Sequence, residues 1–231
     1  NKPEMIFRIG SITKQFTSTA ILKLVEQGKI QLSADITTYL PGFTTPGKTV
    51  TVEHLLNHTS GIKSYTSLPD MMTKQNKAKA ITIDEMLKVI QRQPSDFNPN
   101  DQWLYNNSGY YLLGAIIEKV SGMTYGEYVT KNLFKPAGMN TSFTNDSKLP
   151  KGGTIGYQKE NANDYIVSDY IHPTIPFSAG AIFSTVDDLW KWNQAIFNYK
   201  LLKKESLERA WTPTKLNDGT LISYGYGWQL G

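Results

Sequence analysis

The helical pattern of residues 11–27 constrains the fold of this chain more than any other feature. Apolar side chains recur along it at the spacing of an α-helix, at Phe16, Ala20, Ile21, Leu24 and Val25. Gly28 follows them, and glycine commonly ends a helix because it adopts a left-handed backbone without strain. The pattern predicts a helix that begins near Gly10 and Ser11.

Further helices are predicted at residues 52–56, 83–91, 109–120, 125–133 and 186–197. The second of these has Thr82 or Asp84 near its start, and Gly122 follows the third. Residues 32–43 are expected to be irregular, residues 149–176 to form loops with room for a short strand pair, and residues 224–230 to form a strand. We therefore predict an α+β fold in one domain over residues 1–231, mainly helical over 11–150, with loops, a helix and the start of a sheet region over 151–231.

Composition narrows the class of protein. Hydrophobic residues make up 39% of the 231 residues and charged residues 19%, which is typical of a globular domain. The net charge is +4, but the basic residues are scattered and only three are arginine, so no nucleic-acid partner is expected. Cysteine is absent, which excludes thiol catalysis and disulfides. No apolar stretch approaches the roughly 20 residues that span a bilayer, and no metal, ATP or NAD motif occurs, so no transmembrane segment, metal or cofactor is expected.

A serine and a lysine lie one turn apart at the start of the first helix. Ser11 and Lys14 are at positions i and i+3, so their side chains share one face. Free N–H groups and the positive end of the helix dipole lie at this terminus, where they favour a neutral amine and stabilise an oxyanion. A neutral Lys14 would accept the proton of Ser11, which predicts a nucleophile and its base.

The Ser-x-x-Lys pattern alone has little specificity. With 16 serines and 21 lysines in the chain, chance predicts roughly 1.5 matches, and a second match occurs at Ser60 and Lys63. The context separates the two, because Ser11 opens a periodic helix behind a glycine whereas Ser60 lies in a turn.

A second group of polar residues precedes the helix predicted at 109–120. Tyr105 and Asn107 form the one Tyr-x-Asn among 13 tyrosines. Tyr105 would shuttle a proton as a phenolate or as a relay, and Asn107 would hydrogen-bond a substrate amide and Lys14. Taken without Ser11 and Lys14, the two residues are more typical of a turn than of a site.

Four phrases together resemble one family. They are Phe-Arg-Ile-Gly-Ser-Ile-Thr-Lys-Gln-Phe at 7–16, Leu-Leu-Asn-His-Thr-Ser-Gly at 55–61, Tyr-Asn-Asn-Ser-Gly-Tyr at 105–110, and Ala-Gly-Ala-Ile-Phe-Ser-Thr-Val-Asp-Asp-Leu at 179–189. In this order and across nearly the whole chain they resemble class C β-lactamases, penicillin-binding proteins (DD-peptidases) and related esterases.

The resemblance implies a β-lactamase/DD-peptidase-like fold and a role for each residue. Ser11 would be the acylated nucleophile, with its N–H as half of an oxyanion hole. Lys14 would activate it, Tyr105 would shuttle the proton, and Asn107 would bind the substrate amide. The implied substrates are D-alanyl peptides, β-lactams or small esters, with a peptidase or esterase favoured over a true β-lactamase. The implied location is extracytoplasmic. The alternative is a penicillin-binding or cell-wall sensor module that is acylated without turnover.

Two departures from the family pattern bear on the extent of the chain. The family's third motif, Lys-Thr-Gly or His-x-Gly, is absent, and so are the strands that normally precede the nucleophile helix. We therefore expect a central piece of the domain that lacks its sheet-forming N- and C-terminal parts, and whose activity on its own is uncertain.

Three other features favour structural roles. His58, in the second phrase, is interpreted as shaping a turn. Gly180 is expected in a tight loop near the site. Asp187 and Asp188 are interpreted as capping the helix at 186–197, not as a carboxylate dyad.

Overall fold

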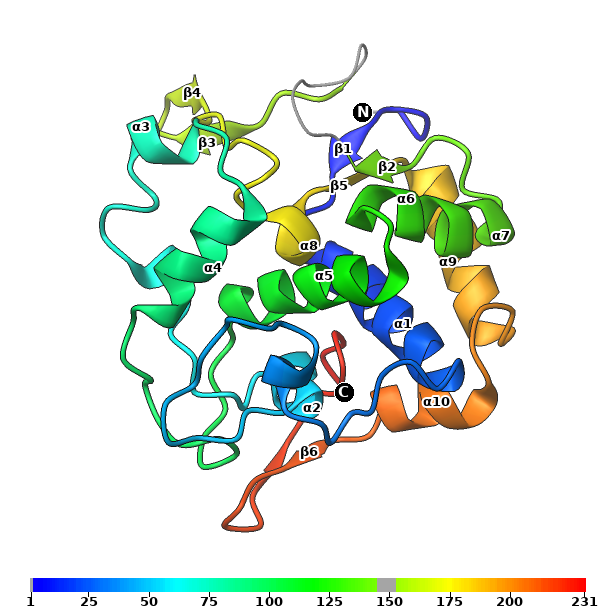
Figure 1. Cartoon of the computed structure of the whole chain (residues 1–231). Coiled ribbons are helices and arrows are strands. Elements are labelled where there is room, and N and C mark those ends of the chain that lie inside the picture. Colours follow the sequence, from blue (N-terminus) through cyan, green and yellow to red (C-terminus); the bar gives the residue numbers. More distant parts are fainter. Residues whose placement is uncertain (1, 145–152) are drawn as a thin grey trace.

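Helices α1 (Thr13–Glu26) and α5 (Asn107–Ser121) cross at the centre of the computed structural model (Figure 1). The structure describes residues 2–144 and 153–231. Every residue of α5 from Ser108 to Ile117 is buried, and so are most residues of α1. The two helices therefore form the centre of the hydrophobic core, and both bring their first turns to the site described below.

Short elements surround this pair (Figure 1). The other helices are α2 (Val52–Leu56), α3 (Lys74–Lys77), α4 (Ile83–Gln91), α6 (Tyr125–Val129), α7 (Lys135–Ala137), α8 (Phe177–Gly180), α9 (Val186–Phe197) and α10 (Lys204–Ala210). Tight 3-10 turns occur at Gly10–Ile12, Ile36–Thr38 and Tyr65–Ser67, and a π-helical turn, Thr130–Phe134, joins α6 to α7. The strands are β1 (Phe7–Arg8), β2 (Phe143–Thr144), β3 (Tyr157–Lys159), β4 (Tyr165–Val167), β5 (Ile182–Ser184), β6 (Thr214–Lys215) and β7 (Leu221–Ile222).

Most predicted helices are confirmed, because their ends are set by local interactions. The bounds of α2, α4 and α9 coincide with the predictions. Thr82 caps α4 by accepting from the N–H of Glu85, whose carboxylate accepts from the N–H of Thr82 in return. Gly28 and Gly122, which follow α1 and α5, both have φ near +69°.

A three-stranded antiparallel sheet fixes the approach to α1. Strand β5 lies between β1 and β2, with Arg8 opposite Phe183 and Thr144 opposite Ile182. The N–H of Ile9 also donates to the carbonyl of Ile182 at 3.0 Å. The expectation that sheet structure is confined to residues 151–231 is therefore wrong, because β1 and β2 come earlier in the chain and are too short to show an alternating pattern.

The strand predicted at residues 224–230 is also wrong. Tyr224 and Gln229 form an isolated bridge around a turn in which Gly227 has φ +87°. A Cβ on Gly225 would lie 1.9 Å from the carbonyl oxygen of Ala210, and one on Gly227 would lie 2.9 Å from that of Lys14. The alternation of aromatic residues and glycine thus reflects close approach of backbones, not the pleat of a strand.

The region predicted as loops with a strand pair contains the hairpin of β3 and β4, in which Gln158 pairs with Ile166. Residues 149–152 of that prediction lie outside the described residues. Sequence patterns did not indicate α10 or the hairpin of β6 and β7, which are short and partly exposed.

Helix α8 lies directly against α5. A Cβ on Gly114 would come within 2.0 Å of the Ser178 hydroxyl, so only glycine permits this approach. The Ser178 hydroxyl donates to the carbonyl of Tyr110 at 2.8 Å, and the hydroxyl of Thr17 on α1 donates to the carbonyl of Ser178 at 2.6 Å. These contacts hold α8 at the crossing of α1 and α5.

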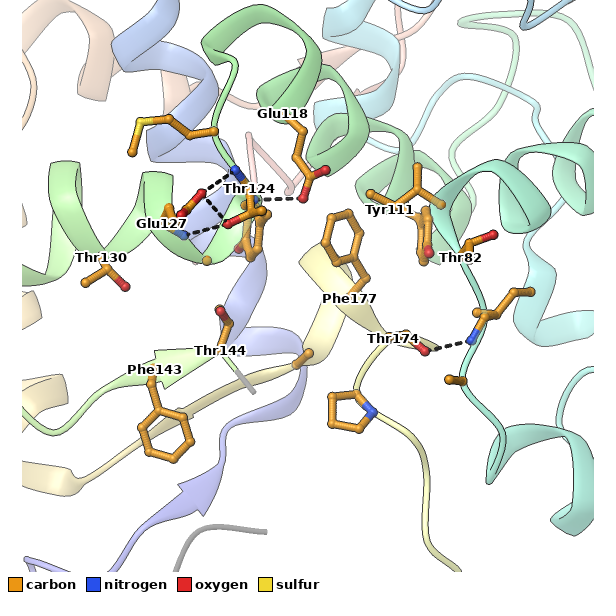
Figure 2. A pocket seen from close by; sticks show the side chains of 18 of the residues that line it. Thr82, Tyr111, Glu118, Thr124, Glu127, Thr130, Phe143, Thr144, Thr174 and Phe177 are labelled. Carbon is orange, nitrogen blue, oxygen red and sulfur yellow. Dashed lines mark hydrogen bonds between the residues drawn. The ribbon is translucent and has the colours of Figure 1, made fainter. Parts of the chain in front are cut away.

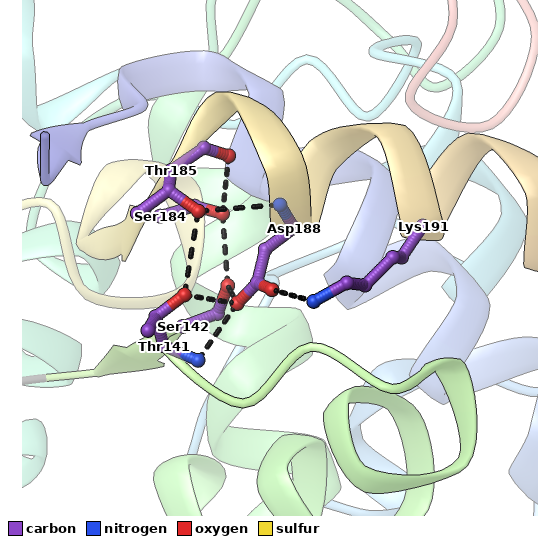
Figure 3. Close-up of polar contacts among 6 residues, drawn as sticks. All are labelled: Thr141, Ser142, Ser184, Thr185, Asp188 and Lys191. Atoms are coloured by element: carbon purple, nitrogen blue, oxygen red, sulfur yellow. Dashed lines mark hydrogen bonds and ion pairs between the residues drawn. The ribbon is translucent and has the colours of Figure 1, made fainter. Parts of the chain in front are cut away.

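A buried carboxylate joins the segment before β2 to α9 (Figure 3). Asp188 accepts from the N–H and hydroxyl of Thr141 at 2.8 and 2.7 Å, from the Ser142 hydroxyl at 2.9 Å, and from Lys191 at 2.9 Å. Burial alone would raise the pKa of Asp188, but these hydrogen bonds outweigh it and lower the pKa. The residue that caps α9 is Thr185, whose hydroxyl accepts from the N–H of Asp188, so the predicted capping by Asp187 and Asp188 is wrong and both lie in the first turn.

We expect Asp188→Ala to lower the free energy of unfolding by about 2–3 kcal/mol, because the buried Ser142 hydroxyl and the two donors of Thr141 lose their acceptor. Asp188→Asn, which retains one oxygen, should cost less. Asp187→Ala is the matched control, since Asp187 is exposed and its loss should change stability by no more than about 0.5 kcal/mol. Urea unfolding measures all three, and equal losses for Asp187→Ala and Asp188→Ala would contradict this role.

Candidate active site

The four residues predicted for catalysis and binding meet at one place. Ser11 lies in the 3-10 turn that leads into α1, and Lys14 follows one turn later, with its Nζ 3.3 Å from the Ser11 Oγ. The Tyr105 hydroxyl donates to the same Oγ at 2.7 Å, and the Asn107 Oδ1 lies 2.9 Å from the Lys14 Nζ. Residues more than 90 positions apart in the sequence are thus brought within hydrogen-bonding distance.

Lys14 is the buried centre of the group. Its side chain is 1% exposed, and its Nζ donates to the carbonyl of Ala179 in α8 at 2.9 Å as well as to Asn107. The amine lies 4.7 Å from the centre of the Tyr105 ring and 5.5 Å from that of Tyr110. Three elements, α1, α5 and α8, therefore surround one nitrogen atom.

This environment changes the protonation of Lys14. Burial lowers the pKa of Lys14 to about 7, because desolvation disfavours the charged form. A neutral amine has two N–H groups, which match Asn107 and Ala179, and one lone pair, which faces the Ser11 Oγ. Lys14 is then able to accept the Ser11 proton.

Tyr105 lies on the open side of the site, where its side chain is 37% exposed. Burial raises the pKa of Tyr105, and the hydrogen bond to Ser11 only partly opposes this. Near neutral pH the residue is therefore a phenol that donates to Ser11. Of the two protonation states considered from the sequence, the structure favours the relay over the phenolate.

Two hydroxyl groups, those of Ser64 and Thr66, fix the orientation of Asn107. Its Nδ2 donates to the Thr66 Oγ1 at 3.2 Å and its backbone N–H to the Ser64 Oγ at 3.2 Å. Because Nδ2 faces Thr66, Oδ1 faces Lys14. Sequence reasoning missed Ser64, Thr66 and Ala179. The first two follow the Asn-His-Thr-Ser-Gly phrase closely, which is the one signal for them, whereas Ala179 contributes only a carbonyl.

The second Ser-x-x-Lys match forms no comparable pair. Lys63 forms an ion pair with Asp96 at 2.8 Å, and the Ser60 hydroxyl accepts from the N–H of Ile62 at 3.3 Å. Context therefore separates the two matches as expected. Gly180 ends the short helix α8 beside the site, and a Cβ there would lie 3.7 Å from the carbonyl carbon of Gly10.

A cavity of about 1010 Å³ lies apart from this group, between α4, α5, α6, α8 and β2 (Figure 2). Its walls include Tyr111, Met123, Phe143 and Phe177, and none of the four predicted site residues lines it. The candidate site is the group around Ser11, where the Lys14 amine and the Tyr105 hydroxyl meet, and no ligand is assigned to the cavity.

Within residues 2–144 and 153–231, no group of three or more His, Cys, Asp or Glu side chains is arranged to hold a metal ion. Over the same residues, no helix has both the length and the apolar character needed to cross a bilayer.

The fold and the Ser-x-x-Lys arrangement at Ser11 place the chain in one structural class, and comparisons with known proteins identify the family. A sequence model of the beta-lactamase family matches residues 1–231, so the chain belongs to this family. This confirms the predicted family and α+β fold, which is mostly helical with small sheets.

Individual relatives are similar over the whole chain. Penicillin-binding protein 4* of Bacillus subtilis is 32% identical over 243 residues, which cover 99% of this chain and 53% of that protein. A D-stereospecific amidohydrolase from a Streptomyces species has a TM-score of 0.85 at 30% identity, over 96% of this chain and 70% of that one. The D-amino acid amidase of Ochrobactrum anthropi, complexed with L-phenylalanine amide, has a TM-score of 0.83 at 27% identity, over 98% of this chain and 66% of that one. The chain spans about half the length of the curated relatives it matches.

The protonation of Lys14 predicts the pH dependence of Ser11 acylation. The rate should fall about tenfold per pH unit below pH 7, where Lys14 is an ammonium, and level off above it, where the amine is neutral. Acylation by a fluorescent penicillin or an activated ester, followed from pH 5.5 to 8.5, measures this. Lys63→Ala should leave the profile unchanged, and a rate that is constant over this range in the unaltered protein would contradict the assignment.

Proposed function

We propose that this protein is an acyl hydrolase that opens an amide, a β-lactam or an ester through an acyl-Ser11 intermediate. The observation that carries the proposal is the convergence of the Lys14 Nζ and the Tyr105 hydroxyl on the Ser11 Oγ, at 3.3 and 2.7 Å. Acyl transfer requires an exposed hydroxyl that is in contact with both a base and a proton donor.

The proposed steps follow from these contacts. Neutral Lys14 takes the proton of Ser11 as the Oγ bonds to the substrate carbonyl carbon. The backbone N–H of Ser11, at the positive end of α1, contributes to stabilising the oxyanion. The proton passes from Lys14 through the Tyr105 hydroxyl to the leaving nitrogen or oxygen, whose bond to the carbonyl carbon breaks. Water then attacks the acyl-enzyme with the same groups acting in reverse.

Substrates closest to those of penicillin-binding proteins and D-amino acid amidases are favoured over those of a true β-lactamase. Support comes from relatives described as a penicillin-binding protein, a D-stereospecific amidohydrolase and an amidase complexed with an amino acid amide. Asn107 faces the base with its Oδ1, and in the proposal it also contacts the substrate amide. The extracytoplasmic location implied by the family resemblance stays a prediction.

Covalent labelling of Ser11 tests the proposal. In the whole protein, a fluorescent penicillin or a fluorophosphonate should label Ser11, and Ser11→Ala should abolish the label because no nucleophile is left. Ser60→Ala, in the second Ser-x-x-Lys match, is the control and should still be labelled. Intact-protein mass spectrometry follows the label with time. Release within minutes supports the hydrolase, a label that lasts for hours supports the alternative of a binding module without turnover, and an unlabelled wild-type protein would refute both.

The role of Lys14 gives a separate prediction. Lys14→Ala should slow acylation on the order of 10²–10⁴-fold, the usual contribution of a general base. Lys63→Ala, which removes the lysine of the other match, should leave the rate within twofold. The measurement is the single-turnover acylation rate at pH 8, with circular dichroism to confirm folding. A folded Lys14→Ala variant that reacts as fast as the wild type would show that another group is the base.

A further inference from the structure

His58 clamps the backbone on both sides of Tyr105. The N–H of Leu104 donates to the His58 carbonyl at 3.1 Å, and the N–H of Asn106 donates to the His58 Nδ1 at 3.2 Å. The His58 ring also packs against the Tyr105 ring, with 4.5 Å between their centres. One residue therefore holds the peptide groups before and after Tyr105 and supports its ring.

The bond from Asn106 sets the tautomer of His58. Because Nδ1 accepts from a backbone N–H, it carries no proton, and the ring proton lies on Nε2, which faces the Tyr224 hydroxyl at 3.1 Å. His58 is 1% exposed, and the rings of Tyr110 and Tyr224 lie 5.1 and 4.9 Å from its own. Burial and the charge of Lys14 lower the pKa of His58 well below its usual value, so the ring stays neutral and Nδ1 stays an acceptor.

The backbone of His58 is itself unusual. Its φ is +65°, in the left-handed region that most side chains avoid and that asparagine, aspartate and histidine enter more readily than others. A glycine would adopt this backbone without strain but would provide no acceptor for Asn106. An asparagine would adopt it and would place its Oδ1 close to the position of the histidine Nδ1.

We propose that His58 is a positioning residue that holds the Tyr105 hydroxyl against Ser11 through the Asn106 N–H and through ring contact. The inference rests on the proposed function, in which Tyr105 relays the proton. Neither ring hydrogen bond of His58 ends on Ser11 or Lys14, whereas the Asn106 N–H and the ring contact both bear directly on Tyr105. The Tyr105 side chain is 37% exposed, so it needs such support. A displacement of about 1 Å in a catalytic group is enough to cost on the order of 100-fold in rate.

Three variants of the whole protein separate the acceptor from the turn. His58→Asn keeps both the left-handed backbone and the acceptor, and should acylate within about fivefold of the wild type. His58→Gly keeps the left-handed backbone but not the acceptor, and its acylation rate should fall about 10- to 100-fold. In a Tyr105→Phe background, His58→Gly should lower the acylation rate by less than about twofold further, because the hydroxyl that His58 positions is already absent.

Two results would overturn the proposal. One is equal acylation rates for folded His58→Asn and His58→Gly proteins, which would mean that only the turn matters. The other is an undiminished effect of His58→Gly in the Tyr105→Phe background, which would mean that His58 acts elsewhere.

Crystal structures of both variants provide a readout that does not depend on activity. The distance from the Tyr105 hydroxyl to the Ser11 Oγ should be kept in His58→Asn and lengthened in His58→Gly. An unlabelled wild-type protein would refute the proposed function, and the crystal structures would still decide whether His58 positions Tyr105. An unchanged distance in His58→Gly would refute the positioning role even if the wild type were acylated.

Discussion

The burial of a single amine, that of Lys14, is the constraint on which the rest of the site depends. Holding Lys14 among apolar neighbours with a pKa of about 7 costs stability on the order of 4 kcal/mol at neutral pH, relative to an unfolded chain in which the amine is charged. The cost is largest below pH 7 and shrinks as the pH rises towards the unfolded pKa. The same burial leaves the amine largely neutral near pH 7 and above, where it is able to accept a proton. At this position, lower stability accompanies the chemistry proposed for Lys14.

The surrounding fold makes that position tolerable. The Lys14 amine reaches Asn107 of α5 and the carbonyl of Ala179 in α8, and α8 is held close to α5 because Gly114 has no side chain. Any side chain at residue 114 would push α8 away, and the amine would then lose the Ala179 carbonyl as an acceptor. The geometry at Ser11 thus depends on packing that is some distance from the reacting atoms.

Local interactions explain which parts of the structure could be predicted from the sequence. The bounds of α2, α4 and α9 follow from caps and short-range periodicity, and the facing of Ser11 and Lys14 follows from helical spacing. Tyr105 and Asn107 required the first motif and the resemblance to a family, since a Tyr-x-Asn phrase alone is more typical of a turn. The Ala179 carbonyl had no signal, because every residue has one. Strand β1 and the turn at Gly227 were mispredicted because their backbones are fixed by distant partners.

The meeting of three elements at one nitrogen has a practical consequence. Positions 14, 107 and 179 come together only when α1, α5 and α8 are all in place. Under the proposed function, an intact chain that has lost any one of these contacts therefore retains the serine but not its activation. A reagent that acylates Ser11 would therefore titrate correctly assembled molecules and not merely the polypeptide present. It would serve as a covalent reporter of native packing in the centre of the molecule.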